Sequence, residues 1–191
     1  LVNAEEYKAI VSNVSSRTAS ITAARGEIVD CNGSKLVYNE QGYSLIFEAA
    51  YFPSEKEQEK RNEIINNLIK LLNKNGVKWE DNLPLVFNKK KDITYKKDSD
   101  VLISKMKSKN MLNLNEYATA QDCFDALIEK YSLKSYSATD ARNIASVLFD
   151  MEKNYFSISA PYTFAKDVPS QVVSYIKENS DFYSGVDVEV V

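Results

Sequence analysis

The spacing of apolar residues changes twice along this chain, and this change constrains the fold more than any other feature. Residues 17–24 and 43–47 are rich in β-branched and apolar side chains, as expected for strands. From Pro53 onward the spacing is that of helices, and strand-like character returns at 155–164 and 186–191. A β-rich start, a helical middle and a mixed end predict an α+β fold.

We expect the two chain ends to pair in a common sheet. In this architecture, residues 1–52 and 155–191 form a β-rich platform, and residues 53–154 form an inserted, mainly helical lobe. A chain of 191 residues is long enough for one sizeable domain or two small ones. The platform and the lobe are therefore interpreted as one composite module.

Several helices of the middle segment have recognisable boundaries. Ser54 is a predicted N-cap, and Gly76 is a predicted helix end. Thr119–Asp122 and Ser137–Asp140 have the spacing of capping boxes. Shorter helices are expected at 5–13, at 98–106 and after Pro169. Between the first two boundaries runs an apolar stripe at helical spacing, made of Ile64, Ile65, Leu68, Ile69, Leu71 and Leu72.

Asn32-Gly33 is the strongest hairpin signal in the chain. Both residues tolerate positive φ, so we expect the backbone to reverse in two residues between an extended segment at 26–30 and a strand at 35–38. Two further extended segments are expected at 83–87 and 92–95.

The composition excludes several classes of function. A net charge of −3 gives no general attraction to nucleic acid. The chain has no run of eighteen apolar residues, so no membrane span is predicted. The chain contains no His, which removes Ser–His and Cys–His nucleophile pairs and most zinc sites. It also has no glycine-rich phosphate-binding motif. We therefore predict no catalytic residue, no metal and no cofactor.

The remaining catalytic patterns are weak. Ser-x-x-Lys, the pattern of serine–lysine acyl transfer, occurs at Ser104 and at Ser174, which is the frequency expected by chance. The paired carboxylates, such as Asp98 with Asp100, are better explained as charges at helix N-termini. A hydrolase with an unrecognised carboxylate site is the least favoured hypothesis.

Two other features have a structural and a functional interpretation. A lysine cluster flanks the stretch Asp92–Tyr95 and forms either a solvated loop, which we favour, or a patch for an anionic polymer such as a wall glycopolymer. Cys31 lies beside Asp30 and Glu27, which raise rather than lower a thiol pKa, so it is interpreted as inert. The lysine cluster that flanks Asp92–Tyr95 consists of Lys89, Lys90, Lys91, Lys96 and Lys97.

The stretch ITAARGEIVDCNGSKLVYN, residues 21–39, resembles the N-terminal motif of class B penicillin-binding proteins, approximately A-x-R-G-x-I-x-D-R-N-G-x-x-L-A. The stretch at 159–191 is similar to the later part of the same module, where Tyr-x-x-Ala-Lys-Asp-Val leads into a helix and then Gly-Val-x-Val. Residues 53–154 match no motif of the family. The motif positions include Arg25, Gly26, Ile28, Asp30, Asn32 and Gly33.

The resemblance implies the pedestal, or dimerisation, module of a peptidoglycan transpeptidase. The parent protein would be anchored by an upstream helix at the extracellular face of the bacterial cytoplasmic membrane. This segment would be non-catalytic. Its implied partners are its own C-terminal transpeptidase domain, a lipid-linked glycan polymerase and other cell-wall synthesis proteins, with no nucleic acid among them. The alternative is a free-standing extracellular module that binds wall polymer.

The motif residues have architectural roles in this interpretation. Arg25 is suited to fixing a carboxylate, and Asp30 is either its partner or a group that bonds the turn amides near Asn32. Gly26 allows close backbone approach. Cys31 stands where the family usually has Arg, so contacts made by that guanidinium are not expected here.

Overall fold

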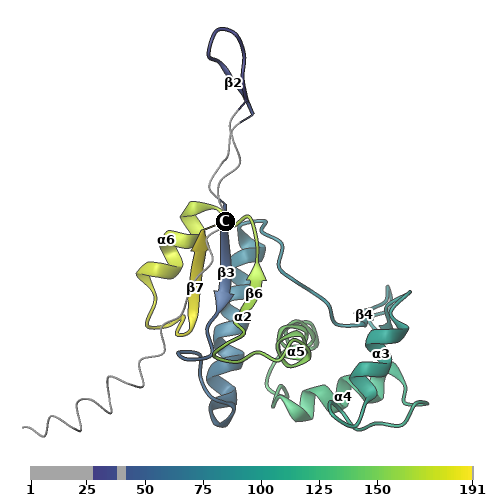
Figure 1. The fold of residues 1–191 in the computed structure, drawn as a ribbon. Helices are drawn as coiled ribbons and strands as arrows, with labels where there is room; N and C mark the ends of the chain where they lie inside the picture. Colours follow the sequence, from purple (N-terminus) through teal and green to yellow (C-terminus); the bar gives the residue numbers. More distant parts are fainter. Residues whose placement is uncertain (1–27, 38–41, 191) are drawn as a thin grey trace, which may run out of the picture. The chain divides into compact units, whose positions relative to one another are not determined.

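The computed structural model describes residues 28–37 and 42–190, and the chain divides into two compact units at 1–40 and 41–191. In its described residues, the first unit forms an antiparallel hairpin of β1 (Ile28–Val29) and β2 (Lys35–Val37) (Figure 1). The helix expected at 5–13 and the strand expected at 17–24 lie outside the described residues.

The second unit is built on a three-stranded antiparallel sheet in the order β6 (Tyr162–Ala165), β3 (Tyr43–Phe47) and β7 (Val186–Val190) (Figure 1). The central strand comes from the early part of the chain and both of its neighbours come from the late part. The predicted α+β class, with early and late segments in a common sheet, is confirmed.

The helical segments begin close to their predicted caps. A 3₁₀ turn, η1 (Glu55–Glu57), follows Ser54 before α2 (Gln58–Lys74) starts, so the α-helix begins later than a cap at Ser54 predicts. Thr119 accepts a bond from the Asp122 amide at 3.2 Å at the start of α4 (Ala120–Lys130). Ser137 accepts one from the Asp140 amide at 3.1 Å at the start of α5 (Ala138–Lys153). Two further helices within residues 42–190 are α3 (Asp100–Lys107) and α6 (Ser170–Glu178).

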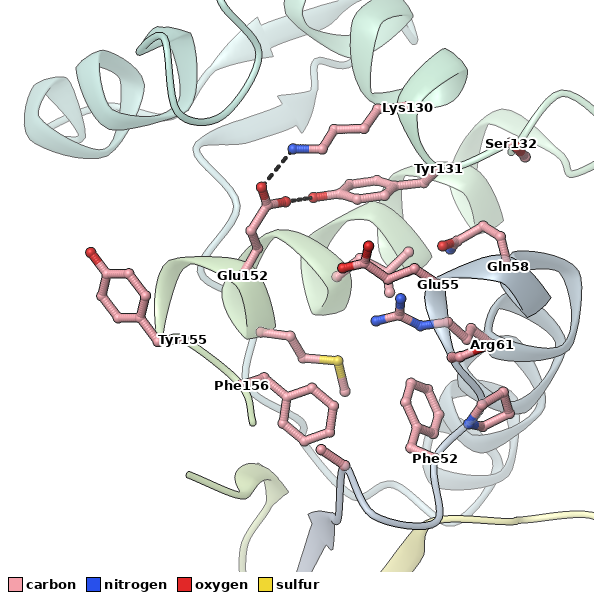
Figure 2. A pocket seen from close by; sticks show the side chains of 15 residues that line it. Phe52, Glu55, Gln58, Arg61, Lys130, Tyr131, Ser132, Glu152, Tyr155 and Phe156 are labelled. Carbon is pink, nitrogen blue, oxygen red and sulfur yellow. Dashed lines mark hydrogen bonds and ion pairs between the residues drawn. The ribbon is translucent and has the colours of Figure 1, made fainter. Parts of the chain in front are cut away.

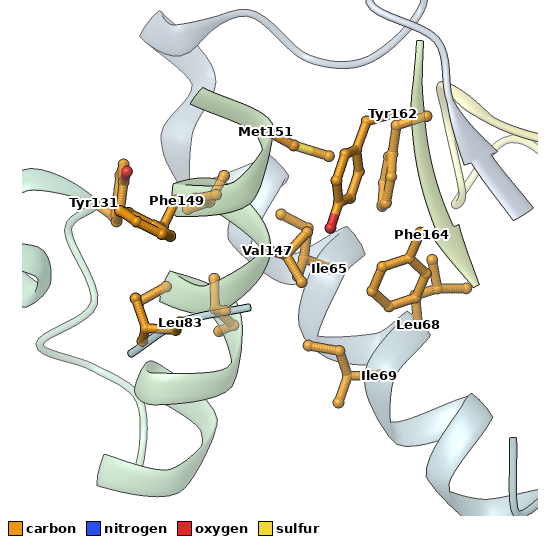
Figure 3. Close-up of a cluster of buried hydrophobic side chains, with 14 of the residues drawn as sticks. Ile65, Leu68, Ile69, Leu83, Tyr131, Val147, Phe149, Met151, Tyr162 and Phe164 are labelled. Carbon is orange, nitrogen blue, oxygen red and sulfur yellow. The ribbon is translucent and has the colours of Figure 1, made fainter. Parts of the chain in front are cut away.

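One buried cluster connects the sheet with the helices. Figure 3 shows Ile65 and Leu68 of α2 near Phe164 of β6, with Val147 of α5 nearby. The Phe47 ring lies 5.6 Å from the Phe164 ring in an edge-to-face arrangement. Each fully buried Leu or Ile contributes about 1.5–3 kcal/mol relative to an exposed one. The sheet and the helical lobe therefore share a core, while the domain boundaries at 52 and 155 stay a prediction.

A second hairpin, β4 (Leu85–Phe87) and β5 (Ile93–Tyr95), is fastened to α5 by a clamp of polar contacts. Arg142, almost fully buried, donates from Nη1 to Asp81 Oδ2 at 2.6 Å and from Nε to the carbonyl oxygen of Leu85 at 2.8 Å. The Ser146 hydroxyl donates to Asp81 Oδ1 at 2.6 Å. The buried guanidinium of Arg142 needs partners for its donors. Because these partners are Asp81 and the Leu85 carbonyl, the contacts hold the start of the hairpin against α5.

Candidate functional site

The motif hairpin of the first unit is shaped by Asp30. Its Oδ1 accepts the amides of Asn32 and Ser34, each at 2.8 Å, and its own amide donates to the Ser34 carbonyl at 2.9 Å. Three residues therefore form the loop, with Gly33 in the left-handed region at φ 83°, and the expected two-residue reversal is wrong. The carboxylate of Asp30 accounts for the wider loop because it satisfies the amides that a tighter turn would leave free.

The structure places the other motif positions only in part. Ile28 is 56% exposed, and Asn32 and Gly33 lie at the solvent-exposed loop. Arg25 and Gly26 lie outside the described residues, so the predicted pairing of Arg25 with Asp30 stays a prediction. Cys31 is exposed and in a free-thiol form.

The lysine cluster lies on the hairpin of β4 and β5, which repeats the same loop design. Asn88 Oδ1 accepts the amides of Lys90 at 2.8 Å and Asp92 at 3.0 Å, and Lys91 occupies the left-handed position at φ 67°. All five predicted lysines are exposed, and none forms an ion pair within the part of the chain that the structure describes. The structure places Lys89, Lys90 and Lys91 in the loop of this hairpin, and Lys96 and Lys97 after β5, at its other end. A single lysine patch therefore stays a prediction.

A separate groove, of about 720 Å³, lies between the start of α2 and the ends of α4 and α5 (Figure 2). We call it the Arg61 groove, after the guanidinium that Figure 2 shows pointing into it. The Arg61 guanidinium lies over the Phe52 ring, 5.4 Å from its centroid. Burial lowers the pKa of Arg61 because desolvation disfavours the charged form.

One wall of the groove carries a satisfied carboxylate. Glu152 accepts from Lys130 Nζ at 2.7 Å through one oxygen and from the Tyr131 hydroxyl at 2.8 Å through the other. Burial and the neighbouring Glu152 carboxylate raise the pKa of Tyr131 far above its ordinary value, so the phenol donates rather than ionises at neutral pH. This wall therefore has no charge left without a partner.

The other wall is aromatic. Phe156 packs edge-to-face on Phe52 with ring centroids 6.0 Å apart, and Tyr155 stands beside it, 79% exposed. Tyr155 holds a φ of 56°, in the left-handed region where glycine is usual at a helix end. The groove thus combines one unpaired guanidinium with a partly solvent-exposed aromatic wall.

Sequence reasoning missed this groove. Its residues come from three separate segments, namely 49–61, 130–132 and 148–156, and no local motif connects them. The one signal available was Arg61 within a helix N-terminal turn rich in Glu, which suggests an exposed ion pair rather than a groove.

Within 28–37 and 42–190, no group of three or more acidic or cysteine side chains is arranged to hold a metal ion. No helix in the same part of the chain has the length and apolar character needed to cross a membrane.

Comparison with known proteins gives one family. A family model described as the penicillin-binding protein dimerisation domain matches residues 20–191. No curated protein gives a significant match to the chain.

Proposed function

Because the chain belongs to the family of penicillin-binding protein dimerisation domains, we propose that it is the non-catalytic pedestal of a membrane-anchored class B penicillin-binding protein. The pedestal would position a transpeptidase domain at the extracellular face of the bacterial cytoplasmic membrane for peptidoglycan synthesis. The family match over residues 20–191 is the observation that carries this proposal.

The register of the sheet supports a positioning role. Tyr43, the first residue of β3, pairs with Val190, the last residue of β7. The chain therefore enters and leaves the second unit at adjacent positions of one antiparallel pair. A domain that follows β7 would be coupled through this pair to β3 and to the shared core.

The proposed partners are the parent's own transpeptidase domain, a lipid-linked glycan polymerase and other cell-wall synthesis proteins. They are expected to use surfaces of this chain, since a pedestal has no substrate of its own. The exposed apolar side chains of the motif hairpin, Ile28, Val29 and Leu36, support such a contact.

A fluorescent penicillin tests the non-catalytic assignment. We expect no stable covalent labelling of this chain, and labelling of the parent protein at a Ser-x-x-Lys serine downstream of it. Covalent labelling of the chain itself would overturn the proposal. So would a parent reading frame without a Ser-x-x-Lys domain.

The second candidate is a wall-polymer-binding module, favoured by five exposed lysines in and next to the β4–β5 hairpin, which form no ion pair with any described residue. Co-sedimentation with purified cell wall compares the wild-type chain with a variant that carries Glu at all five positions. A Gln variant at the same positions is the matched control, since it removes charge without reversing it. Polymer binding predicts retention in the order Lys, Gln, Glu, whereas equal retention argues against it.

A further inference from the structure

The Arg61 groove contains a cation without an anion. In the described residues, the Arg61 guanidinium forms no ion pair and no hydrogen bond, and its Nε is buried without a partner. A buried polar group without a partner is destabilising, and more so if it is charged. The ring of Phe52 offsets only part of this cost through the cation–π contact.

The carboxylates that line the groove do not neutralise Arg61. Glu152 is already held by Lys130 and Tyr131. Glu55 attracts Arg61 electrostatically from the rim, but no oxygen of Glu55 lies within ion-pair distance of the guanidinium. Figure 2 shows the guanidinium between Glu55 and Phe52, open toward the groove.

The aromatic wall supplies a second recognition element next to the cation. Tyr155 keeps a strained backbone and a largely exposed ring, and no packing in the described residues repays that conformation. Phe156, which is half-buried, continues the apolar surface. A ligand matching this wall would place an aromatic or large aliphatic group beside its anionic group.

We propose that the Arg61 groove binds a peptide segment of a partner protein in which a Glu or Asp is flanked by an aromatic or large aliphatic side chain. The carboxylate bonds to Arg61, and the neighbouring side chain packs against Tyr155 and Phe156. A guanidinium and a carboxylate match in charge and in planar geometry. The inference rests on the proposed function only in identifying the partner as a cell-wall synthesis protein, because the binding itself does not require it.

Fluorescence titration of the whole chain with matched peptides tests the proposal. The probes are labelled, end-blocked peptides Gly-Phe-Glu-Phe-Gly and Gly-Phe-Gln-Phe-Gly, together with Gly-Ala-Glu-Ala-Gly. We expect the first to bind about ten-fold or more tightly than either of the others, the difference expected for one charge-assisted contact or one buried ring. Equal affinities, or no binding of the first peptide at about 1 mM, would overturn the proposal.

Three variants locate the site. Arg61→Gln should abolish the preference for Glu over Gln, whereas Lys60→Gln, which removes the same charge one residue away and outside the groove, should leave it intact. Glu55→Gln should tighten binding because it removes the competitor for Arg61. A preference that survives in Arg61→Gln, with an unchanged melting temperature, would contradict the assignment. Penicillin labelling of the chain would overturn the pedestal function without affecting these affinities.

Discussion

At the scale of the residue, Tyr155 has a conformation that its side chain does not favour. An L-residue in the left-handed region costs about 1–2 kcal/mol relative to glycine. Tyr155 is 79% exposed and recovers little of this through burial, and Lys105 Nζ lies 5.9 Å from the centroid of its ring. We interpret the residue as retained for binding rather than for stability.

Tyr155→Gly should therefore stabilise the chain. We expect the free energy of unfolding to rise by about 0.5–1 kcal/mol, since relief of the backbone strain exceeds loss of a weak exposed cation–π contact. Urea denaturation measures this change. Tyr155→Ala, which keeps the strain, is the control and should give no gain. A Tyr155→Gly variant that is less stable than the wild type would contradict the strain argument. Unchanged peptide affinity of this variant would contradict the interpretation of Tyr155 as a binding residue.

Gly185 shows the opposite case, a position that only glycine fits. Its φ is 78°, and a Cβ there would overlap backbone atoms of Phe52. Gly185→Ala should cost about 3 kcal/mol, because it adds a steric clash to an unfavourable φ. Gly76 has a similar φ of 67° but open space around it. Gly76→Ala should therefore cost only about 1 kcal/mol. Equal losses in chemical denaturation would show that the Phe52 backbone moves aside.

At the scale of the element, the clamp around Arg142 decides whether the β4–β5 hairpin stays on α5. Arg142→Ala removes the Nε donor to the Leu85 carbonyl and one of the two donors to Asp81, which keeps the Ser146 hydroxyl. We expect a loss of about 2–3 kcal/mol, less than for a fully buried pair because Asp81 is partly exposed.

Lys70→Ala is the matched control for the clamp. Lys70 forms an exposed ion pair with Asp140 at 3.6 Å, so its removal should cost no more than about 0.5 kcal/mol. Hydrogen exchange should also show faster exchange at β4 and β5 in Arg142→Ala alone. A similar, small effect of both substitutions would mean that the hairpin is held mainly by its apolar contacts.

The elements were predictable wherever the signal was local. The strand at Tyr43–Phe47 and the caps at Thr119 and Ser137 follow from alternation and from side chains that bond nearby amides. The loop at Asp30 was predicted too short because the choice between two and three residues depended on where one carboxylate bonds. Sequence rules for turns allow an Asp side chain to accept these turn amides, but they do not determine whether it does so.

At the scale of the whole molecule, the shared sheet was predictable and the groove was not. The early and late strands are recognisable from their apolar composition, and pairing them in one sheet buries their apolar side chains together. The Arg61 groove depends instead on how α2, α4 and α5 pack, which brings Phe52 next to Phe156 across about a hundred positions of sequence. No pattern within one segment encodes that distance.

The buried tyrosines predict alkaline unfolding of the whole chain. Burial and the neighbouring carboxylates, Glu152 and Asp150, raise the pKa values of Tyr131 and Tyr162 above the value of about 10 in an unfolded chain. The unfolded state therefore releases these protons first. Their stabilisation is complete below about pH 10 and is lost as the pH rises toward the folded-state pKa.

Each buried tyrosine should reduce the free energy of unfolding by about 1.4 kcal/mol per pH unit above pH 10. Chemical denaturation between neutral and alkaline pH measures the slope, and phenolate absorbance reports the ionisation. Tyr162→Phe should reduce the slope by about 1.4 kcal/mol per pH unit, which is the contribution of one proton. Tyr117→Phe, which removes a hydroxyl at a site that is 86% exposed, is the control. A slope that is the same in both variants would show that Tyr162 ionises without unfolding.

The pairing of Tyr43 with Val190 has a mechanical consequence. A pull that separates the segment before β3 from the segment after β7 acts at the same end of one antiparallel ladder. The load then falls on one rung at a time, beginning with this pair, instead of being shared along the strands as in shear. Under tension, the second unit should therefore open first at the β3–β7 pairing. Strand β7 would separate from β3 while α2 and α5 remain packed.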